Sequence, residues 1–317
     1  MLFLKEADVR ALLPMKDCIE QMRAAFRALG EDRAINQPRR RLILPAGAVL
    51  HQLAAWWGKY FGAKIYSSHV KHGTNFLFLL YEAETARPLA LFEADHLGQL
   101  RTGAASGLAT DLLARKDASV MAVIGSGFQA RGQAEAVCAV RSIREIRVWS
   151  RSGEKRAAYA REMEEKLRVR VRAAESAREA VEGAEVVATA TFAKEPVLES
   201  EWVAAGAHVN AVGTNVANRR EIPAALVLRA NPIVVDSVEQ AKMEAGDLIQ
   251  ALPEEDWKRR VASLDQVLCG TWRSSTPGNI TFFKSVGLGV EDVAAAALVY
   301  ERAKAGGAGM ELPILYS

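Results

Sequence analysis

The sequence predicts an α/β protein built around a parallel β-sheet, joined to a second domain of α+β type. From about residue 117 onward, short apolar runs rich in β-branched residues alternate with Ala-rich or Glu/Arg-rich helical stretches. This alternation is typical of βαβ units, whose strands lie parallel in one sheet. The first 110 residues instead combine a helical stretch with several strand-like runs. The length of 317 residues suits two such domains.

The N-terminal part is expected to form one helix and then four strands. The helix covers 16–29, and the strand-like runs are 41–44, 62–67, 76–81 and 88–93. A last helical stretch at 290–305 lies beyond the βαβ-like strands, so we expect it to return to the first domain. The predicted domains are therefore 1–116 plus 290–317, and 117–289.

The central part is expected to contain six strands of the parallel sheet. Each is a short apolar run between helical stretches, because strands of such sheets are buried on both faces. The runs are 119–124, 145–150, 169–173, 185–191, 208–212 and 233–236. The stretch 154–168 carries Glu, Lys or Arg at most positions, and we interpret it as a solvated helix.

The strongest local motif is GSGFQA at 125–130, which follows the first of these strands directly and leads into a helix. In this G-x-G-x-x-A form, Gly125 permits a tight turn, Gly127 lets the backbone approach a pyrophosphate, and Ala130 lets the helix pack closely on the strand. The helix N-terminus offers unpaired N–H groups to the phosphates. The sequence therefore predicts a doubly wound, Rossmann-type sheet that binds a dinucleotide.

The residues after the second strand bear on which dinucleotide binds. Twenty residues beyond Ala130, where NAD-selective sites usually carry Asp or Glu, the chain has Ser150 and Arg151. Arg151 can pair with a 2′-phosphate, so we expect NADP(H) to be preferred over NAD(H). The alternative is that Arg151 is a solvated loop residue.

Composition argues against several other kinds of partner and site. There are 41 Lys and Arg against 38 Asp and Glu, a balance of +3 that favours neither nucleic acid nor an anionic membrane. The longest stretches without a charged residue have 17 residues, short of the ~20 that span a bilayer. The three cysteines are far apart, as expected of free thiols in a cytoplasmic protein. His69 and His72 have no third ligand nearby, so we expect no metal site.

A second set of candidates comes from the N-terminal part. Chemistry at an amino or imino acid needs cations for the carboxylate and a polar group that moves a proton at the nitrogen. Arg40 in QPRRR, Lys64 in FGAKIYSSH and Arg101 in LRTGAASGLAT supply these charges. Arg40 has an arginine on either side, so its register is open by one residue. Lys64 lies in an apolar strand, where a lysine without a partner is rare.

Taken in order, several blocks of the chain resemble the ornithine cyclodeaminase and mu-crystallin family. The blocks are QPRRR, GAK, RTGAASGLAT, IGSGFQA, HVNAVGTNVANRREIP, VVDSVEQAKMEAGD and FFKSVGLGVEDVAAA, and together they cover nearly the whole chain. The resemblance implies a homodimer in which the Rossmann domain is inserted into a substrate-binding and dimerisation domain. It also implies a small amino-acid or imino-acid substrate and a nicotinamide cofactor.

Carried over residue by residue, the resemblance gives roles to residues of both domains. Arg40, Lys64 and Arg101 correspond to contacts with the substrate carboxylate and imine, and Thr214 is a further substrate contact. Together with the glycine turn, the expected cofactor contacts are Thr74, Arg101, Gly125, Ser126, Gly127, Phe128, Gln129, Ser150, Arg151, Thr191, Val212, Arg219, Ser285 and Val286.

One departure from the family pattern concerns Asn215. Cyclodeaminases and archaeal-type alanine dehydrogenases carry an aspartate in this turn, and an amide cannot act as a general base near neutral pH. We therefore expect an NAD(P)-dependent imine or ketimine reductase that delivers hydride to the α-carbon, with Lys64 and Asn215 as candidate catalytic residues. Two alternatives stay open. One is a cyclodeaminase that releases ammonia from ornithine or a related diamino acid, and the other is a non-catalytic binder of cofactor and a small ligand.

Overall fold

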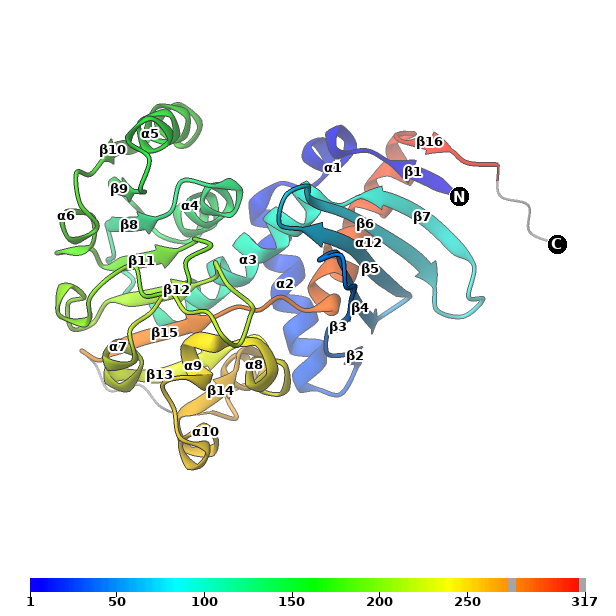
Figure 1. The fold of residues 1–317 in the computed structure, drawn as a ribbon. Coiled ribbons are helices and arrows are strands. Elements are labelled where there is room, and N and C mark those ends of the chain that lie inside the picture. Colours follow the sequence, from blue (N-terminus) through cyan, green and yellow to red (C-terminus); the bar gives the residue numbers. More distant parts are fainter. Residues whose placement is uncertain (273–277, 314–317) are drawn as a thin grey trace. The chain divides into compact units, whose positions relative to one another are not determined.

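The computed structural model describes residues 1–272 and 278–313, which form two compact units (Figure 1). Unit 1 comprises Met1–Arg101 and Gly287–Ser317, and unit 2 comprises Thr102–Val286. The sequence places the boundaries after 116 and 289, whereas the first division of the structure falls earlier, inside helix α3 (Asp95–Leu113). A boundary inside one continuous helix leaves no break in the sequence pattern.

Unit 1 is built on an eight-stranded mixed sheet, sheet A. Its strands are β1 (Leu2–Leu4), β2 (Ala34–Asn36), β3 (Arg40–Ile43), β4 (Val49–Trp57), β5 (Tyr60–His69), β6 (Gly73–Glu82), β7 (Pro88–Glu93) and β16 (Met310–Glu311). They run in the order β16-β1-β7-β6-β5-β4-β2, with β3 paired to β4. β1 lies parallel to β7, and the other neighbours are antiparallel.

The helices of unit 1 close its core. They are α1 (Glu6–Leu12), α2 (Met15–Gly30), the start of α3, and α12 (Gly289–Gly306). In α2 the buried residues recur every three or four positions from Met15 to Phe26, which gives the helix one apolar face. α12 is buried along most of its length and packs against α2, β4 and β5. In Figure 1 this orange helix lies among the blue and cyan elements of the first hundred residues.

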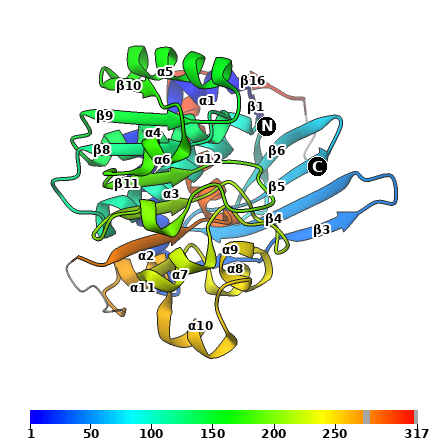
Figure 2. The ribbon, with the colours of Figure 1, turned by 60° about the vertical axis from the view of Figure 1, so that its left-hand side comes forward.

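Unit 2 is built on an eight-stranded sheet, sheet B, in which all neighbours are parallel. Its strands are β8 (Val120–Ile124), β9 (Glu145–Trp149), β10 (Arg170–Ala173), β11 (Val186–Thr189), β12 (His208–Ala211), β13 (Ala230–Val235), β14 (Val261–Ser263) and β15 (Ile280–Lys284). Their order is β10-β9-β8-β11-β12-β15-β13-β14, and Figure 2 shows β10, β9, β8 and β11 side by side. β9 and β10 lie on one side of β8, whereas the next strand in the chain, β11, lies on its other side. This is the switch point at which such sheets bind ligands, outside the carboxyl ends of the strands.

Helices cover both faces of sheet B, as a doubly wound fold requires. Along β8, Met121 and Val123 belong to one apolar cluster and Ala122 and Ile124 to another, because successive residues of a strand point to opposite faces. The helices of unit 2 are α4 (Phe128–Val140), α5 (Gly153–Leu167), α6 (Ala177–Val181), η1 (Ser200–Trp202), α7 (Ala224–Arg229), α8 (Val238–Glu244), α9 (Gly246–Ile249), α10 (Glu254–Arg260) and α11 (Leu264–Leu268). Within the described ranges, no helix is long and apolar enough to cross a membrane.

The six strands expected in the central part correspond to β8–β13, with ends that differ by at most three residues. The sequence pattern does not predict β14 and β15 in this sheet, or β1, β2, β4 and β16 in sheet A. β15 enters between β12 and β13, although β13 and β14 precede it in the chain. Its sequence, ITFFK, ends in a lysine whose partners lie elsewhere in the chain, and this charge interrupts the apolar pattern of a buried strand.

Candidate functional site

The loop between β8 and α4 has the geometry of a phosphate-binding turn. Gly125 adopts a φ of +115°, and a Cβ at this position would clash with the carbonyl oxygen of Ala190, so only glycine fits. At Gly127 a Cβ would meet nothing within 4 Å, and the backbone therefore faces open space. Helix α4 begins at Phe128 with no hydrogen bond from a capping side chain. Its N-terminal N–H groups and the positive end of its dipole suit an anion.

The ends of β8 and β9 are tied together by two predicted residues. The hydroxyls of Ser126 and Ser150 form a hydrogen bond of 2.9 Å. Arg151 follows and is exposed, and Ser152 caps α5 by accepting a hydrogen bond from the backbone N–H of Lys155. This corner thus presents hydroxyls, a guanidinium and a helix N-terminus, and residues 150–153 include no acid.

Three predicted residues lie on the loops after β11 and β12. Thr191 donates its N–H and its hydroxyl to the carboxylate of Glu221, at 2.6 and 2.7 Å. Val212 follows β12 directly. The guanidinium of Arg219 lies over the exposed ring of Phe192, 5.8 Å from its centroid. These loops flank the carboxyl edge of sheet B next to the switch point.

The turn after β12 also holds Thr214 and Asn215. The carbonyl oxygen of Thr214 accepts a hydrogen bond of 2.6 Å from the Nζ of Lys284, and Lys284 forms a buried ion pair of 2.8 Å with Asp247. Asn215 is half-buried in the same turn. The buried ammonium of Lys284 therefore holds this turn in place.

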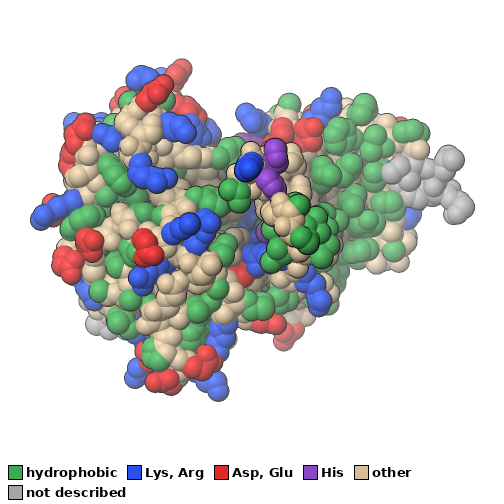
Figure 3. Space-filling model, viewed as in Figure 1, with side chains coloured by type: hydrophobic (Ala, Val, Ile, Leu, Met, Phe, Trp, Pro, Cys, Tyr) green, Lys and Arg blue, Asp and Glu red, His purple; other side chains and the backbone are tan. Residues whose placement is uncertain are grey.

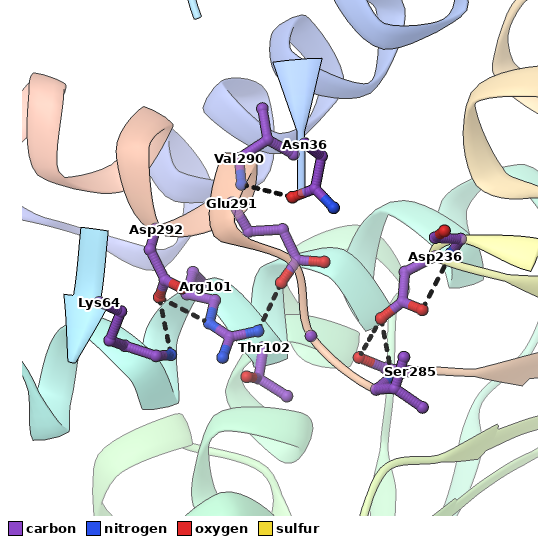
Figure 4. A network of polar contacts seen from close by, with 12 residues as sticks. Asn36, Lys64, Arg101, Thr102, Asp236, Ser285, Val290, Glu291 and Asp292 are labelled. Atoms are coloured by element: carbon purple, nitrogen blue, oxygen red, sulfur yellow. Dashed lines mark hydrogen bonds and ion pairs between the residues drawn. The ribbon is translucent and has the colours of Figure 1, made fainter. Parts of the chain in front are cut away.

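Ser285 and Val286 follow β15 and are held by one carboxylate (Figure 4). The Oδ2 of Asp236 accepts hydrogen bonds from the hydroxyl of Ser285 at 3.1 Å and from the N–H of Val286 at 2.7 Å. Asp236 follows β13, so this contact fixes the carboxyl ends of two neighbouring strands.

The residues of unit 2 fit a nicotinamide dinucleotide. The structure gathers the predicted residues of this unit at the carboxyl ends of β8, β9, β11, β12 and β15, around the glycine turn. Two of them carry buried polar atoms that have no hydrogen-bond partner among the described residues, the Oε1 of Gln129 and the Oγ1 of Thr214. Orphaned buried atoms of this kind are usually satisfied by a water or a ligand. Arg101 and Thr74, also predicted as cofactor contacts, belong to unit 1.

Unit 1 contains a buried cluster of opposite charges around Lys64 (Figure 4). Lys64 lies on β5 and its Nζ donates to the Oδ1 of Asp292 at 3.0 Å. The Nε of Arg101, on α3, is 3.0 Å from the same oxygen, and its Nη1 donates to Glu291 at 2.6 Å. All four side chains are buried. The structure therefore brings together two predicted residues, Lys64 and Arg101, through two adjacent acids of α12.

The position of Lys64 perturbs its protonation. Burial is the main cause that lowers the pKa of Lys64 to about 8, and the nearby Arg101 lowers it further, whereas Asp292 raises it. At neutral pH the ammonium therefore keeps its proton but releases it more easily than an exposed lysine does. Such a shifted group in a buried cluster is a candidate for acid–base chemistry.

The first two arginines of the triplet differ in burial. Arg40 is exposed on β3, and the structure does not bring it to Lys64. Arg39 is buried instead, where its Nη1 donates to the hydroxyl of Tyr66 at 2.6 Å and its Nη2 to the carbonyl of Gly287 at 3.1 Å. Tyr66 lies two residues after Lys64 on β5, hence on the same face of the strand.

Two further expectations concern residues on the β5–β6 hairpin. Thr74 is exposed and pairs with Ser68, whereas Lys64 pairs with Phe78, four residues further along β6. At the ~3.4 Å rise of a strand, this separates Thr74 from the Lys64 position by about 14 Å. His69 stacks on His72, and among the described residues no group of three His, Cys, Asp or Glu could hold a metal ion.

Several buried charged residues that lie beside predicted residues were not expected from the sequence. In unit 1 these are Arg39, Glu291 and Asp292, and in unit 2 they are Glu221, Asp247 and Lys284. The signal for the two α12 acids is their place in GVEDVAAAALVY, because charged residues inside an otherwise apolar helix need buried partners.

Parallel sheets with this strand order and this glycine turn are characteristic of dinucleotide-binding α/β proteins. Within that class, the chain belongs to the ornithine cyclodeaminase/mu-crystallin family, whose family model matches residues 1–307.

Relatives of similar length extend over almost the whole chain. A Δ(1)-pyrroline-2-carboxylate reductase of Bacillus cereus is 35% identical over 98% of this chain and 99% of its own. The structure of the Thermococcus litoralis Δ(1)-pyrroline-2-carboxylate reductase in complex with NADH and L-proline has a TM-score of 0.93 and 34% identity, covering 98% of this chain and 100% of that one. An archaeal alanine dehydrogenase, solved as a dimer with bound NAD, has a TM-score of 0.92 and 30% identity, covering 99% of each chain. The predicted family and α/β fold class are confirmed, and these relatives are enzymes, as predicted for this chain.

Proposed function

We propose that this chain is an NAD(P)H-dependent reductase of α-imino acids, and that its substrate is a cyclic imine carrying a carboxylate, of the Δ1-pyrroline-2-carboxylate kind. The observation that carries the proposal is the buried cluster of Lys64, Asp292 and Arg101, because it offers a proton donor among an excess of positive charge. Relatives support the same class, since one is named for this substrate and another was solved with NADH and L-proline, the product of its reduction.

Lys64 is the proposed proton donor. Its ammonium donates to the imine nitrogen, and the positive charge gained there makes the adjacent α-carbon more electrophilic. The pKa of about 8 favours this transfer near neutral pH. Asp292 holds the ammonium in place through its 3.0 Å hydrogen bond. When bound, the reduced nicotinamide supplies the hydride that the α-carbon accepts.

The substrate carboxylate is the proposed partner of the arginines. Arg39, Lys64 and Arg101 carry three positive charges against the two negative charges of Glu291 and Asp292, which leaves one positive charge in the cluster. A buried excess charge is costly unless an anion compensates it. We propose Arg39 for the role first given to Arg40, because Arg39 is buried and is oriented by the hydroxyl of Tyr66.

A preference for NADP(H) over NAD(H) is part of the proposal. Ser150, the exposed Arg151 and the N-terminus of α5 together suit a 2′-phosphate, and the first acid after β9 is Glu154, in the first turn of α5. Turnover with each cofactor tests this directly. R151E is expected to reverse the preference at least tenfold in kcat/KM, and a wild-type enzyme that prefers NADH would overturn the assignment.

We further propose that the chain forms a homodimer through sheet A. Hydrophobic side chains gather over the strands of unit 1 in Figure 3, and the β3 segment exposes Leu42, Ile43 and Leu44. Exposed apolar patches of this kind mark interfaces. The archaeal alanine dehydrogenase was solved as a dimer. Light scattering of wild type and I43D tests this: the wild type should have the mass of a dimer and the variant a lower mass, whereas a monomeric wild type contradicts it.

A cyclodeaminase is the alternative reaction. It needs a general base for the substrate amine, and the amide of Asn215 cannot serve as one near neutral pH. Asn215 can instead orient an imine or a water by hydrogen bonding.

The experiment that tests the proposed function follows NADPH absorbance and ammonia release with three substrates: Δ1-pyrroline-2-carboxylate, pyruvate plus ammonia, and ornithine. We expect NADPH oxidation with the cyclic imine and no ammonia from ornithine. K64A should abolish turnover with the fold intact, whereas K59A, which removes an exposed lysine between β4 and β5, should not. Ammonia from ornithine without net change in the cofactor would establish the cyclodeaminase instead, and a K64A variant of near-normal activity would refute the role of Lys64.

A further inference from the structure

The carboxylate of Glu221 lies beneath two loops of unit 2 and receives four hydrogen bonds. Its Oε1 accepts from the N–H and the hydroxyl of Thr191, at 2.6 and 2.7 Å. Its Oε2 accepts from the N–H of Gly213 at 2.7 Å and from the hydroxyl of Thr189 at 3.2 Å. One buried side chain thus joins the loop after β11 to the loop after β12.

The two loops approach too closely to tolerate a side chain between them. A Cβ on Gly213 would clash with the backbone N and O of Thr191 and with the Oε1 of Glu221. The spacing of the loops is therefore set by the carboxylate and by the bare backbone around it. Thr191 and Val212, expected as cofactor contacts, and Thr214, expected as a substrate contact, all lie on these loops.

A buried ion pair fixes the base of the same loop. Asp247 accepts hydrogen bonds at its Oδ1 from the backbone N–H of Glu221 at 2.6 Å and of Ile222 at 3.0 Å. Lys284 pairs with the other oxygen of Asp247 and donates to the carbonyl of Thr214. The loop from Gly213 to Ile222 is thus held at its start by Glu221 and Lys284, and at its end by Asp247.

We propose that Glu221 is a positioning residue of the cofactor site, which holds the β11 and β12 loops at the spacing that the nicotinamide end of the dinucleotide requires. This inference rests on the proposed function. Both oxygens of the carboxyl group must accept, because all four hydrogen bonds point toward it and each oxygen receives one backbone N–H. Burial raises the pKa of Glu221, whereas Lys284 and the hydrogen bonds from Thr191 lower it. A glutamine in either orientation would set its NH2 against one of those two N–H groups.

Glu185 provides a matched control. It lies just before β11, at the opposite end of the sheet, and its Oε2 accepts from the N–H and hydroxyl of Ser119 and from the N–H of Val120, at 2.6, 3.1 and 3.1 Å. It also ties two chain segments together through backbone N–H groups, but at the amino ends of the strands. E185Q removes the charge of a carboxylate that links two segments without reaching the carboxyl edge, and its amide oxygen can still accept the three hydrogen bonds.

The test measures binding rather than turnover. Titrations of the full chain would compare the Kd of NADPH, read by its fluorescence, with the Kd of 2′,5′-ADP, which lacks the nicotinamide half, read by calorimetry. E221Q should raise the Kd of NADPH at least tenfold and change the Kd of 2′,5′-ADP by less than twofold. E185Q should change neither Kd by more than twofold. If the substitution only distorted unit 2, the Kd values of both ligands would rise by the same factor.

A second variant covers the case in which E221Q does not fold. E221D keeps a carboxyl group near Lys284, but its side chain is one methylene shorter and cannot reach both loops, so the same selective loss is expected. The role of Glu221 would be overturned if either variant bound NADPH as tightly as the wild type does. It would also be overturned if the affinities for NADPH and 2′,5′-ADP fell equally. A wild-type chain that binds neither NADPH nor NADH would overturn the proposed function itself, and with it this inference.

Discussion

Replacing Asp292 by asparagine tests how unit 1 controls the protonation of Lys64. In the wild type, Asp292 is the main group that raises the pKa of Lys64 against burial and the two arginines. Its oxygen lies 3.0 Å from the Nζ. Even at the dielectric constant of water, two charges at that distance attract by about 1.4 kcal/mol, which equals about one pKa unit. The less polar interior makes this a lower bound, so D292N should lower the pKa of Lys64 from about 8 to about 7 or below.

The sign of the effect on activity follows from the role of Lys64 as a proton donor. The reductive reaction needs the ammonium, so kcat/KM of the wild type should fall as the pH rises through about 8. In D292N the fall should begin at least one unit lower, and at pH 8 the variant should retain about a tenth or less of its own low-pH activity. Initial rates of NADPH oxidation from pH 5.5 to 9.5 measure both curves.

E291Q is the matched control for this experiment. Glu291 lies on the same helix and contacts Arg101 but has no hydrogen bond to Lys64. E291Q should shift the alkaline fall of kcat/KM to lower pH by less than D292N does. Thermal unfolding at pH 7 checks that each variant is folded, because breaking a buried ion pair costs about 3–5 kcal/mol. An alkaline limb in D292N that stays near pH 8, or moves upward, would refute the reasoning.

Three further predictions concern other parts of the chain. R39M should raise the KM for the imino acid at least tenfold, and the exposed R40M should leave it within twofold; steady-state kinetics that show the reverse would return the role to Arg40. G127V should abolish NADPH binding in fluorescence titrations, because its side chain occupies the open space before α4, and retained affinity would contradict a phosphate site there. Burial lowers the pKa of His208 to about 3 from its ordinary value near 6.5. The unfolded chain therefore binds the extra proton as the pH falls below 6.5, and stability falls by up to about 1.4 kcal/mol for each pH unit from this group. Urea unfolding at pH 7 and 5 should show a smaller loss in H208Q than in the wild type, and equal losses would assign the effect to other groups.

The parallel sheet was predictable because its strands are short apolar runs separated by helices. β15 was not, since its place between β12 and β13 depends on a long return of the chain, and its last residue, Lys284, gains its partners only in the folded state. Sequence patterns report local periodicity, whereas the position of this strand depends on its pairing with β12 and β13, which are both distant from it in the chain.

In the candidate site, too, local features could be predicted from the sequence and long-range contacts could not. The glycine turn was predictable because strand, turn and helix are adjacent in the chain. Lys64 stood out as a lysine in an apolar strand, but its partner Asp292 is 228 residues away, and no spacing rule links the two. The choice between Arg39 and Arg40 depends on the residue at which β3 begins and on which side chain turns inward, and adjacent arginines give no local signal for either.

The most direct measurement of the central claim follows the hydride itself. NADPH deuterated at the transferred position of nicotinamide C4 would be incubated with the chain and Δ1-pyrroline-2-carboxylate, and the product would be examined by mass spectrometry and NMR. The proposed function predicts L-proline with one deuterium on its α-carbon for each NADPH oxidised, and K64A should yield none. Proline without the label, or no proline while the wild-type chain binds NADPH, would contradict imine reduction at this site.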